Sequence, residues 1–142
     1  MSTTTTKDGM EGLTTTASRF GPKDTMDRLE AEIRAKGMTV FARIDHAAGA
    51  AEAGLELRPT ELIIFGNARG GTPLMEASQT AGIDLPLKAL VWQDAAGTTW
   101  LSYNEPGWIV QRHGLGIRAE IVDKMAAALS AISRKAADPP KA

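Results

Sequence analysis

The sequence contains no cysteine, few aromatic residues and no excess of basic charge. Without cysteine the chain has no disulfide, no cysteine-ligated metal and no thiol nucleophile, so packing and hydrogen bonds must stabilise the fold. Lys and Arg number 16 against 17 Asp and Glu, a formal charge of −1, which lacks the long-range attraction that nucleic-acid binding requires. We therefore expect no nucleic-acid partner.

Long apolar runs are also missing, most clearly at the two ends of the chain. Residues 1–12 are rich in threonine and polar residues, and residues 136–142 contain Pro139 and Pro140. Neither segment has the pattern of a signal peptide or a membrane anchor, so we expect two disordered tails, no membrane partner and a cytoplasmic protein. With 43% hydrophobic content, the remaining residues 13–135 are enough for a single domain with its own core.

Hydrophobic periodicity in the first half of the chain indicates alternating strands and helices. It predicts a short strand over Leu13–Phe20, a helix from Pro22 to a glycine cap at Gly37, and a strand over Met38–Ile44. The alanine-rich segment that follows predicts one or two loose helical turns. The continuous apolar run within Glu61–Gly66 is typical of a central strand buried on both faces.

The second half of the chain predicts a β-hairpin. The segments Leu87–Gln93 and Thr98–Tyr103 read as strands, and the short connection between them ends in Gly97. A connection of this length places Trp92 nearly opposite Trp100, where the two rings can form a cross-strand aromatic pair.

Helices are predicted on either side of this hairpin. Thr72 and Pro73 are the residue types preferred at the N-cap and first position of a helix, which would run to about Ala81. A short helix is predicted over Trp108–His113, and an apolar stripe over Ile117–Ile132 predicts the last one. The elements predict a single compact α+β domain in the order β-α-β-β-α-β-β-α, with a mixed or antiparallel sheet of about five strands and about three helices.

Five short motifs occur in order along this chain: Ile44-Asp45-His46, Phe65-Gly66-Asn67, Gly71-Thr72-Pro73-Leu74-Met75, Asp84-Leu85-Pro86-Leu87-Lys88 and Tyr103-Asn104. Together with Arg112-His113-Gly114-Leu115 they resemble the family called domain of unknown function 302 (DUF 302). The resemblance implies a compact α+β fold, a homodimer and a bacterial family with no settled activity. One departure is Ala68, because the family usually has proline after the Phe-Gly-Asn motif; alanine there leaves the backbone less restricted.

The segment from Gly66 to Thr72 connects a buried strand to a predicted helix start. Such a turn offers backbone N–H groups to an anion, so we predict a small anionic ligand there; an ordinary flexible turn with a helix cap is the competing interpretation. Thr72 stands where a P-loop requires lysine, so nucleotide hydrolysis is not supported. The predicted ligand-binding residues are Asn67, Arg69, Gly71 and Thr72, with Tyr103 and His46 as pocket neighbours.

The two histidines are the candidate acid/base groups. Asp45 can orient the ring of His46 only if the chain bends, because adjacent side chains on a strand point to opposite sides; a backbone-bonded imidazole is the alternative. His113 precedes Gly114 at a predicted helix end, where the helix dipole already favours a cation. Two histidines exclude a His-rich metal site, and we expect neither metal nor cofactor.

Three further polar residues remain candidates with plain structural alternatives. Asp84 and Asn104 fit ordinary turns, whereas Lys88 should share a strand face with Leu90 and Trp92.

Helices are expected to cover one face of the sheet, which leaves the other face of the hairpin as the expected surface of a homodimer. The leading hypothesis is a homodimeric domain that binds a small anion; the alternatives are a histidine-dependent enzyme and a structural or partner-binding module.

Overall fold

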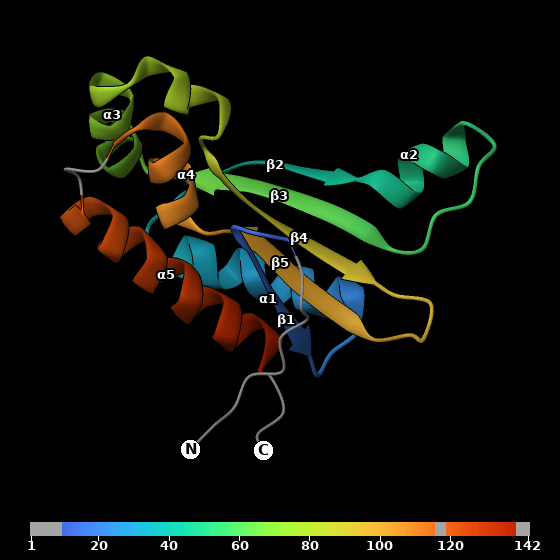
Figure 1. Cartoon of the computed structure of the whole chain (residues 1–142). Helices are drawn as coiled ribbons and strands as arrows, with labels where there is room; N and C mark the ends of the chain where they lie inside the picture. Colours follow the sequence, from blue (N-terminus) through green and yellow to red (C-terminus); the bar gives the residue numbers. More distant parts are fainter. Residues whose placement is uncertain (1–9, 116–118, 139–142) are drawn as a thin grey trace.

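The strands form one antiparallel sheet, and two long helices pack on one of its faces (Figure 1). The computed structural model describes residues 10–115 and 119–138. In chain order the elements are β1 (Leu13–Ser18), α1 (Pro22–Ala35), β2 (Thr39–Asp45), α2 (His46–Glu52), β3 (Thr60–Gly66), α3 (Ala68–Ala77), the 3-10 helix η1 (Gln79–Ile83), β4 (Leu87–Gln93), β5 (Thr99–Asn104), α4 (Pro106–His113) and α5 (Ala119–Ala137). The α+β class is confirmed, although the described residues contain more helices than the three predicted.

The strand order in the sheet is β1-β5-β4-β3-β2, so β4 is the central strand. The strand β3 lies inside the sheet between β4 and β2, as a core strand should, but the prediction that it is buried on both faces was wrong. Ile63 and Phe65 are fully buried, whereas Leu62 and Ile64, which point to the opposite face, are half-buried. The difference arises because α1 and α5 cover only the first of these faces.

The main core lies between that covered face and the two long helices. Met26, Leu29 and Ile33 of α1 are fully buried, at the helical spacing that the sequence shows. Leu129 and Ile132 of α5 join them in the same cluster. Burying one such side chain stabilises a fold by about 1.5–3 kcal/mol, so this layer supplies much of the stability.

The helix α5 extends further than predicted. Ala136 and Ala137, which were placed in a disordered tail, belong to α5 and are fully buried. The predicted apolar residue Ile117 lies outside the described residues, as do residues 1–9 and 139–142 of the predicted tails. Within the described part of the chain, no helix is both long and apolar enough to cross a bilayer.

The predicted hairpin is confirmed in its register. Trp92 is the direct partner of Trp100, and the two ring centroids lie 6.2 Å apart in a stacked arrangement. Gly97 adopts a φ of 88° at the end of the turn, a conformation that glycine adopts without strain. Gly37 and Gly114 likewise have positive φ after α1 and α4, so the predicted helix ends are also confirmed.

The predicted start of α3 was wrong. The helix begins at Ala68, with Asn67 as its N-cap, and the Oδ1 atom of Asn67 accepts a hydrogen bond from the backbone N–H of Arg69 at 2.9 Å. Thr72 and Pro73 lie inside the helix rather than at its first turn. Asparagine is as strong an N-cap as threonine, and here the earlier of the two competing caps begins the helix.

Candidate functional site

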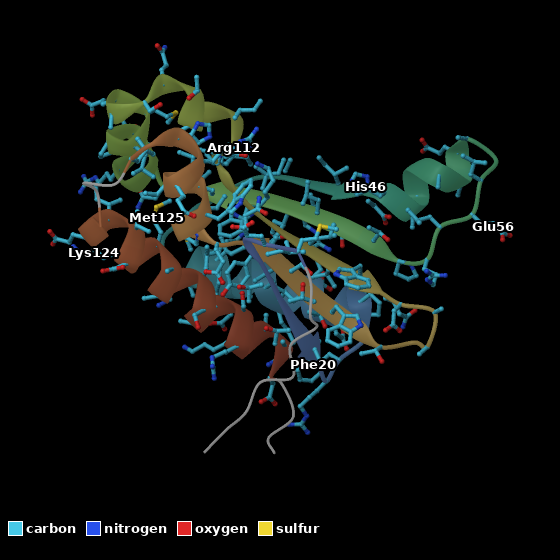
Figure 2. The ribbon with its side chains drawn as sticks, viewed as in Figure 1. Phe20, His46, Glu56, Arg112, Lys124 and Met125 are labelled. Carbon is cyan, nitrogen blue, oxygen red and sulfur yellow. The ribbon has the colours of Figure 1, made fainter. Side chains whose placement is uncertain are left out.

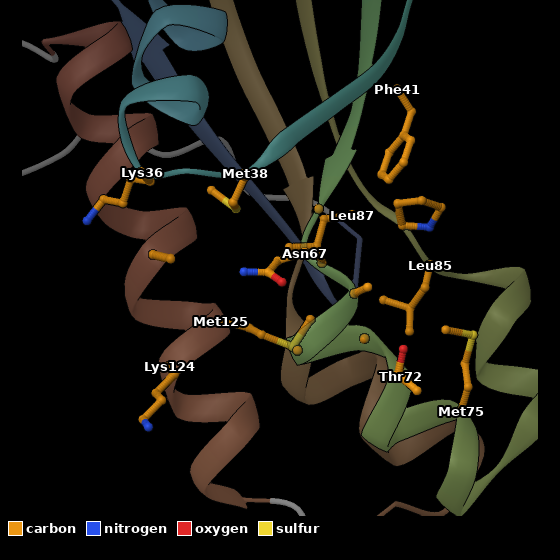
Figure 3. Close-up of a pocket in the computed structure, with 16 residues that line it drawn as sticks. Lys36, Met38, Phe41, Asn67, Thr72, Met75, Leu85, Leu87, Lys124 and Met125 are labelled. Carbon is orange, nitrogen blue, oxygen red and sulfur yellow. The ribbon is translucent and has the colours of Figure 1, made fainter.

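A cavity of about 520 Å³ opens where α3 and α5 meet the ends of β3 and β4 (Figure 3). It is lined by the following residues: Lys36, Met38, Phe41, Gly66, Asn67, Ala68, Gly70, Gly71, Thr72, Met75, Leu85, Pro86, Leu87, Lys124, Met125 and Ala128. The volume lies within the range of small-molecule sites, about 300–1,000 Å³. It is therefore large enough for a small organic ligand.

Most of the cavity wall is apolar, and three methionines contribute to it. Met38 precedes β2, Met75 lies on α3 and Met125 lies on α5, so three separate elements bring these side chains together. Leu85 and Leu87 add branched apolar surface. Methionine is flexible and polarisable, and it is frequent at surfaces that adapt to ligands of different shape.

The charged residues of the cavity carry one sign only. Lys36 follows α1 and Lys124 lies on α5; among the described residues that line the cavity, none is acidic. Lys124 has a distant partner, because its Nζ atom lies 3.8 Å from Glu120 and both side chains are exposed. Both charged side chains of the lining are therefore cationic, which favours an anionic group near them.

Asn67 brings a directed hydrogen-bond donor to the same place. Its Oδ1 atom is turned to the first turn of α3, where it caps the helix. In Figure 3 its Nδ2 atom points to the opposite side, the side on which Lys36 and Met125 lie. An amide nitrogen in this orientation can donate a hydrogen bond to an anionic ligand in the cavity.

Two adjacent glycines keep part of the cavity open. Gly70 and Gly71 lie within α3 and line the cavity, and a helical glycine costs about 1 kcal/mol relative to alanine. A Cβ atom built on Gly71 would lie 3.9 Å from both Leu85 and Met75, at ordinary contact distance, and one on Gly70 would have nothing within 4 Å. Packing does not require glycine at either position. The absence of a side chain at these two positions therefore mainly leaves room in the cavity.

Of the predicted ligand residues, Asn67, Gly71 and Thr72 line the cavity, whereas Arg69, Tyr103 and His46 do not. The side chain of Arg69 is exposed on α3. Tyr103 is 8% exposed and belongs to the main core. Burial, together with the nearby carboxylate of Glu105, raises the pKa of its hydroxyl.

Asp45 and His46 lie at the beginning of α2, away from α5 and its residue Met125 (Figure 2). The Oδ1 atom of Asp45 accepts a hydrogen bond from the backbone N–H of Ala48 at 2.9 Å and so caps α2. The imidazole of His46 is exposed on the first residue of that helix. The acid therefore has a structural role here, and the chain turns from β2 into α2 at this point.

His113 and Asp84 are brought together, although the sequence placed each in a separate structural role. The Nε2 atom of His113 lies 2.6 Å from Oδ2 of Asp84, and Nδ1 lies 2.9 Å from Oγ1 of Thr80. Arg112 contacts both oxygens of the same carboxylate at 3.1 Å. This cluster joins α4 to η1, and none of its members lines the cavity.

The two other polar candidates lie on the sheet. Lys88 is on the same face of β4 as Leu90 and Trp92, as predicted, and its Nζ atom donates to the backbone carbonyl of Pro86 at 3.3 Å. Asn104 is the last residue of β5. Neither lines the cavity.

A second hollow, of about 500 Å³, lies near the other end of the sheet. Two of the charged residues that line it pair with each other, because Arg43 donates to Glu61 at 2.9 and 3.0 Å. Arg43 also donates to Asp27 and Glu30 of α1 at 3.0 Å. The hydrogen bond from Arg43 is the main reason that the pKa of Glu30 is lowered. These contacts tie α1 to β2 and β3, so this hollow is part of the framework.

The fold and the cavity define a class: an antiparallel α+β domain with helices on one sheet face and a methionine-lined cavity at the end of the sheet. The chain belongs to the family described as Domain of unknown function DUF302, which it matches over residues 14–132. A crystal structure of an uncharacterized conserved protein DUF302 from Bacillus stearothermophilus superimposes with a TM-score of 0.80 at 22% identity, over 89% of this chain and 99% of that one. The family resemblance and the fold that it implied are both confirmed.

Two curated relatives come from Brucella species. "Fluoride-specific ion channel FluC 1" of Brucella suis biovar 1 is 50% identical over 113 residues, which are 80% of this chain and 44% of that protein. "Fluoride-specific ion channel FluC 2" of Brucella melitensis biotype 1 is also 50% identical over 113 residues, which are 42% of its length. The chain therefore spans less than half the length of these relatives.

The sequence reasoning missed the apolar residues and the lysines of the cavity. Met38, Met75 and Met125 fit the periodicity of a strand or a helix, and nothing local distinguishes them from core residues. One feature of the sequence could have indicated them: it contains 6 methionines, a high number for 142 residues, and several of them could have been expected to line one surface.

Proposed function

We propose that this domain binds a small amphipathic anion, a molecule with an apolar body and a single carboxylate-like head, in the cavity between α3 and α5. The observation that carries the proposal is the lining itself: an apolar wall whose charged residues, among those described, are Lys36 and Lys124. The proposal keeps the anionic ligand expected from the sequence and adds an apolar body that the cavity wall favours.

The two parts of such a ligand have different partners. The apolar body would pack against the methionines and Leu85, and each buried methylene group contributes about 0.8 kcal/mol. The head would accept a hydrogen bond from Nδ2 of Asn67 and lie in the field of the two lysines. Inorganic phosphate has no apolar body, and the exposed lysines alone stabilise an anion only weakly, so we expect it to bind poorly.

Thermal melting and calorimetry with a homologous series test the proposal. Butanoate, hexanoate and octanoate should raise the melting temperature in increasing order, because each adds apolar surface to be buried. Octanol, which has the body without the charge, should raise it less than octanoate. A ligand at one hundred times its Kd stabilises a protein by about 2.7 kcal/mol, which is readily measured.

Matched variants separate binding in the cavity from general effects. Gly71→Val should abolish binding, because the new side chain would extend from 3.9 Å contacts with Leu85 and Met75 into the cavity. Gly49→Val is the control, since Gly49 is also helical, lies on exposed α2 and has nothing within 4 Å of an added Cβ. Equal binding by the two variants, or no stabilisation by any carboxylate, would reject the proposal.

The two lysines have a control of the same kind. The double variant Lys36→Gln and Lys124→Gln should reduce the preference for octanoate over octanol. Lys23→Gln, on the exposed first turn of α1, should leave that preference unchanged.

The names of the Brucella relatives refer to channel activity, but the segment that aligns with this chain makes up only 42–44% of those proteins. The proposed function therefore does not include channel activity.

A further inference from the structure

Asp84, His113 and Thr80 form a continuous hydrogen-bonded chain outside the cavity. His113 is the last residue of α4, Asp84 follows η1, and Thr80 lies within η1. The carboxylate oxygen, the two ring nitrogens and the hydroxyl are linked at 2.6 and 2.9 Å. Each link is within the distance of a strong hydrogen bond, so the three groups are already positioned relative to one another.

The chemistry of the partners fixes the direction of the hydrogen bonds. An ionised carboxylate has no proton to give, so Nε2 of His113 donates to Asp84 and, in the neutral ring, Nδ1 accepts from the hydroxyl of Thr80. Arg112 binds both oxygens of Asp84 at 3.1 Å and holds the carboxylate in place. The lone pair on Nδ1 of His113 is therefore directed at the hydroxyl proton of Thr80.

Burial is distributed unevenly along this chain of groups. The side chains of His113 and Asp84 are 7% and 12% exposed, whereas Thr80 is exposed. If this contact served only to hold α4 against η1, the His113–Asp84 pair would be sufficient and the hydroxyl of Thr80 would not be needed. Here the base and its orienting acid are shielded from water, and the oxygen that they can activate faces the solvent, where a substrate can reach it.

We propose that Thr80, His113 and Asp84 form a nucleophilic site that hydrolyses small esters. Oγ1 of Thr80 attacks the ester carbonyl carbon while its proton passes to Nδ1 of His113, and Asp84 stabilises the imidazolium. The bond to the leaving alcohol breaks, and the alcohol takes that proton. Water then attacks the acyl-threonine with His113 again accepting a proton, which releases the carboxylic acid and regenerates the hydroxyl.

Hydrolysis of p-nitrophenyl acetate by the purified full chain tests this site, with mass spectrometry to locate an acetyl group. We expect acetylation of Thr80, and a rate about one hundredfold lower in Thr80→Val and in His113→Gln, the size typical of a lost acid/base step. The chain contains 2 histidines, so His46→Gln, which changes the exposed imidazole on α2, is the matched control and should keep the wild-type rate.

Two outcomes would overturn the proposal. The first is a wild-type rate in Thr80→Val, which retains the His113–Asp84 pair and so remains informative even if His113→Gln loosens α4. The second is acetylation elsewhere with none on Thr80. Melting curves of every variant separate a lost reaction from a lost fold. Because these residues do not line the cavity, the result is independent of octanoate binding.

Discussion

Asn67 uses the two ends of its side-chain amide for different purposes. The oxygen caps α3 and the nitrogen faces the cavity side. Removing the cap in Asn67→Ala should lower the free energy of unfolding by about 1 kcal/mol. Asn67→Asp keeps a good N-cap, and its charge is favoured at a helix N-terminus, but it replaces the donor by an anion. We expect this variant to melt like the wild type and to lose octanoate binding.

Chemical denaturation and calorimetry on the same two variants measure both effects. If Asn67→Asp bound octanoate as well as the wild type does, the head group would have to lie elsewhere. If Asn67→Ala were as stable as the wild type, the cap would be unimportant and α3 would have to be held by its packing alone.

Among single residues, the sequence correctly indicates those whose position depends on their neighbours in the chain. Asn67, Gly71 and Thr72 stand next to one another after an apolar strand, and all three line the cavity. Tyr103 and Met125 show the limit of the same reasoning. Pairing with Ala89 and Thr14 turns the tyrosine to the core, and packing of α5 against α1 and α4 directs the methionine to the cavity, and both depend on contacts between distant segments.

At the scale of elements, α3 provides the sharpest test of how the glycine-rich segment is built. Gly70 is helical and has open space at its Cβ position. Gly70→Ala should therefore stabilise the protein by up to about 1 kcal/mol, both by helix propensity and by restricting the unfolded chain. In a flexible turn with positive φ at this position, the same change would destabilise it.

The measurement is the midpoint of urea denaturation, with Gly37→Ala as the comparison. Gly37 has a φ of 78° after α1, so alanine there is strained and should lower stability. A shift of both variants in the same direction would contradict the assignment of residues 68–71 to a helix.

The elements that the sequence predicts best are those with one strong local signal. The hairpin has its turn glycine and a clear alternation, and its register is as predicted. The start of α3 has two competing signals, Asn67 as a cap and Pro73 as a first-turn residue, and local reasoning chose the second. Cap strength alone does not rank such alternatives. The structure has the earlier start, which places the buried Gly71 inside the helix.

At the scale of the whole molecule, the sheet is covered unequally. The pairing of β3 with β4 places Leu62 beside Leu90 on the face opposite α1 and α5, and both side chains are half-buried. Trp92 lies on the same face. Next to them the edge strand β2 carries Ile44, which is 40% exposed. An apolar sheet face of this kind gains free energy when it is covered, since burial contributes about 25 cal/mol per Å².

From this surface we predict the homodimer that the sequence analysis expected, with two copies joined through the open sheet face. Stable dimers bury about 800 Å² on each partner, which is the area that an interface through this face would have to reach. In analytical ultracentrifugation the wild type should sediment as a dimer at micromolar concentration. Leu90→Lys should sediment as a monomer, because the charge would be desolvated at the centre of the interface.

The control for this variant changes another apolar residue in the same way. Ile83→Lys alters a side chain that is 72% exposed on η1, away from the sheet, and should remain a dimer. Leu90 is half-buried in the single chain, so a lysine can extend its amino group to water, and the variant should keep the wild-type fold. A monomeric wild type, or dimers of both variants, would show that the copies do not associate through this face and that the tryptophan pair serves the single chain alone.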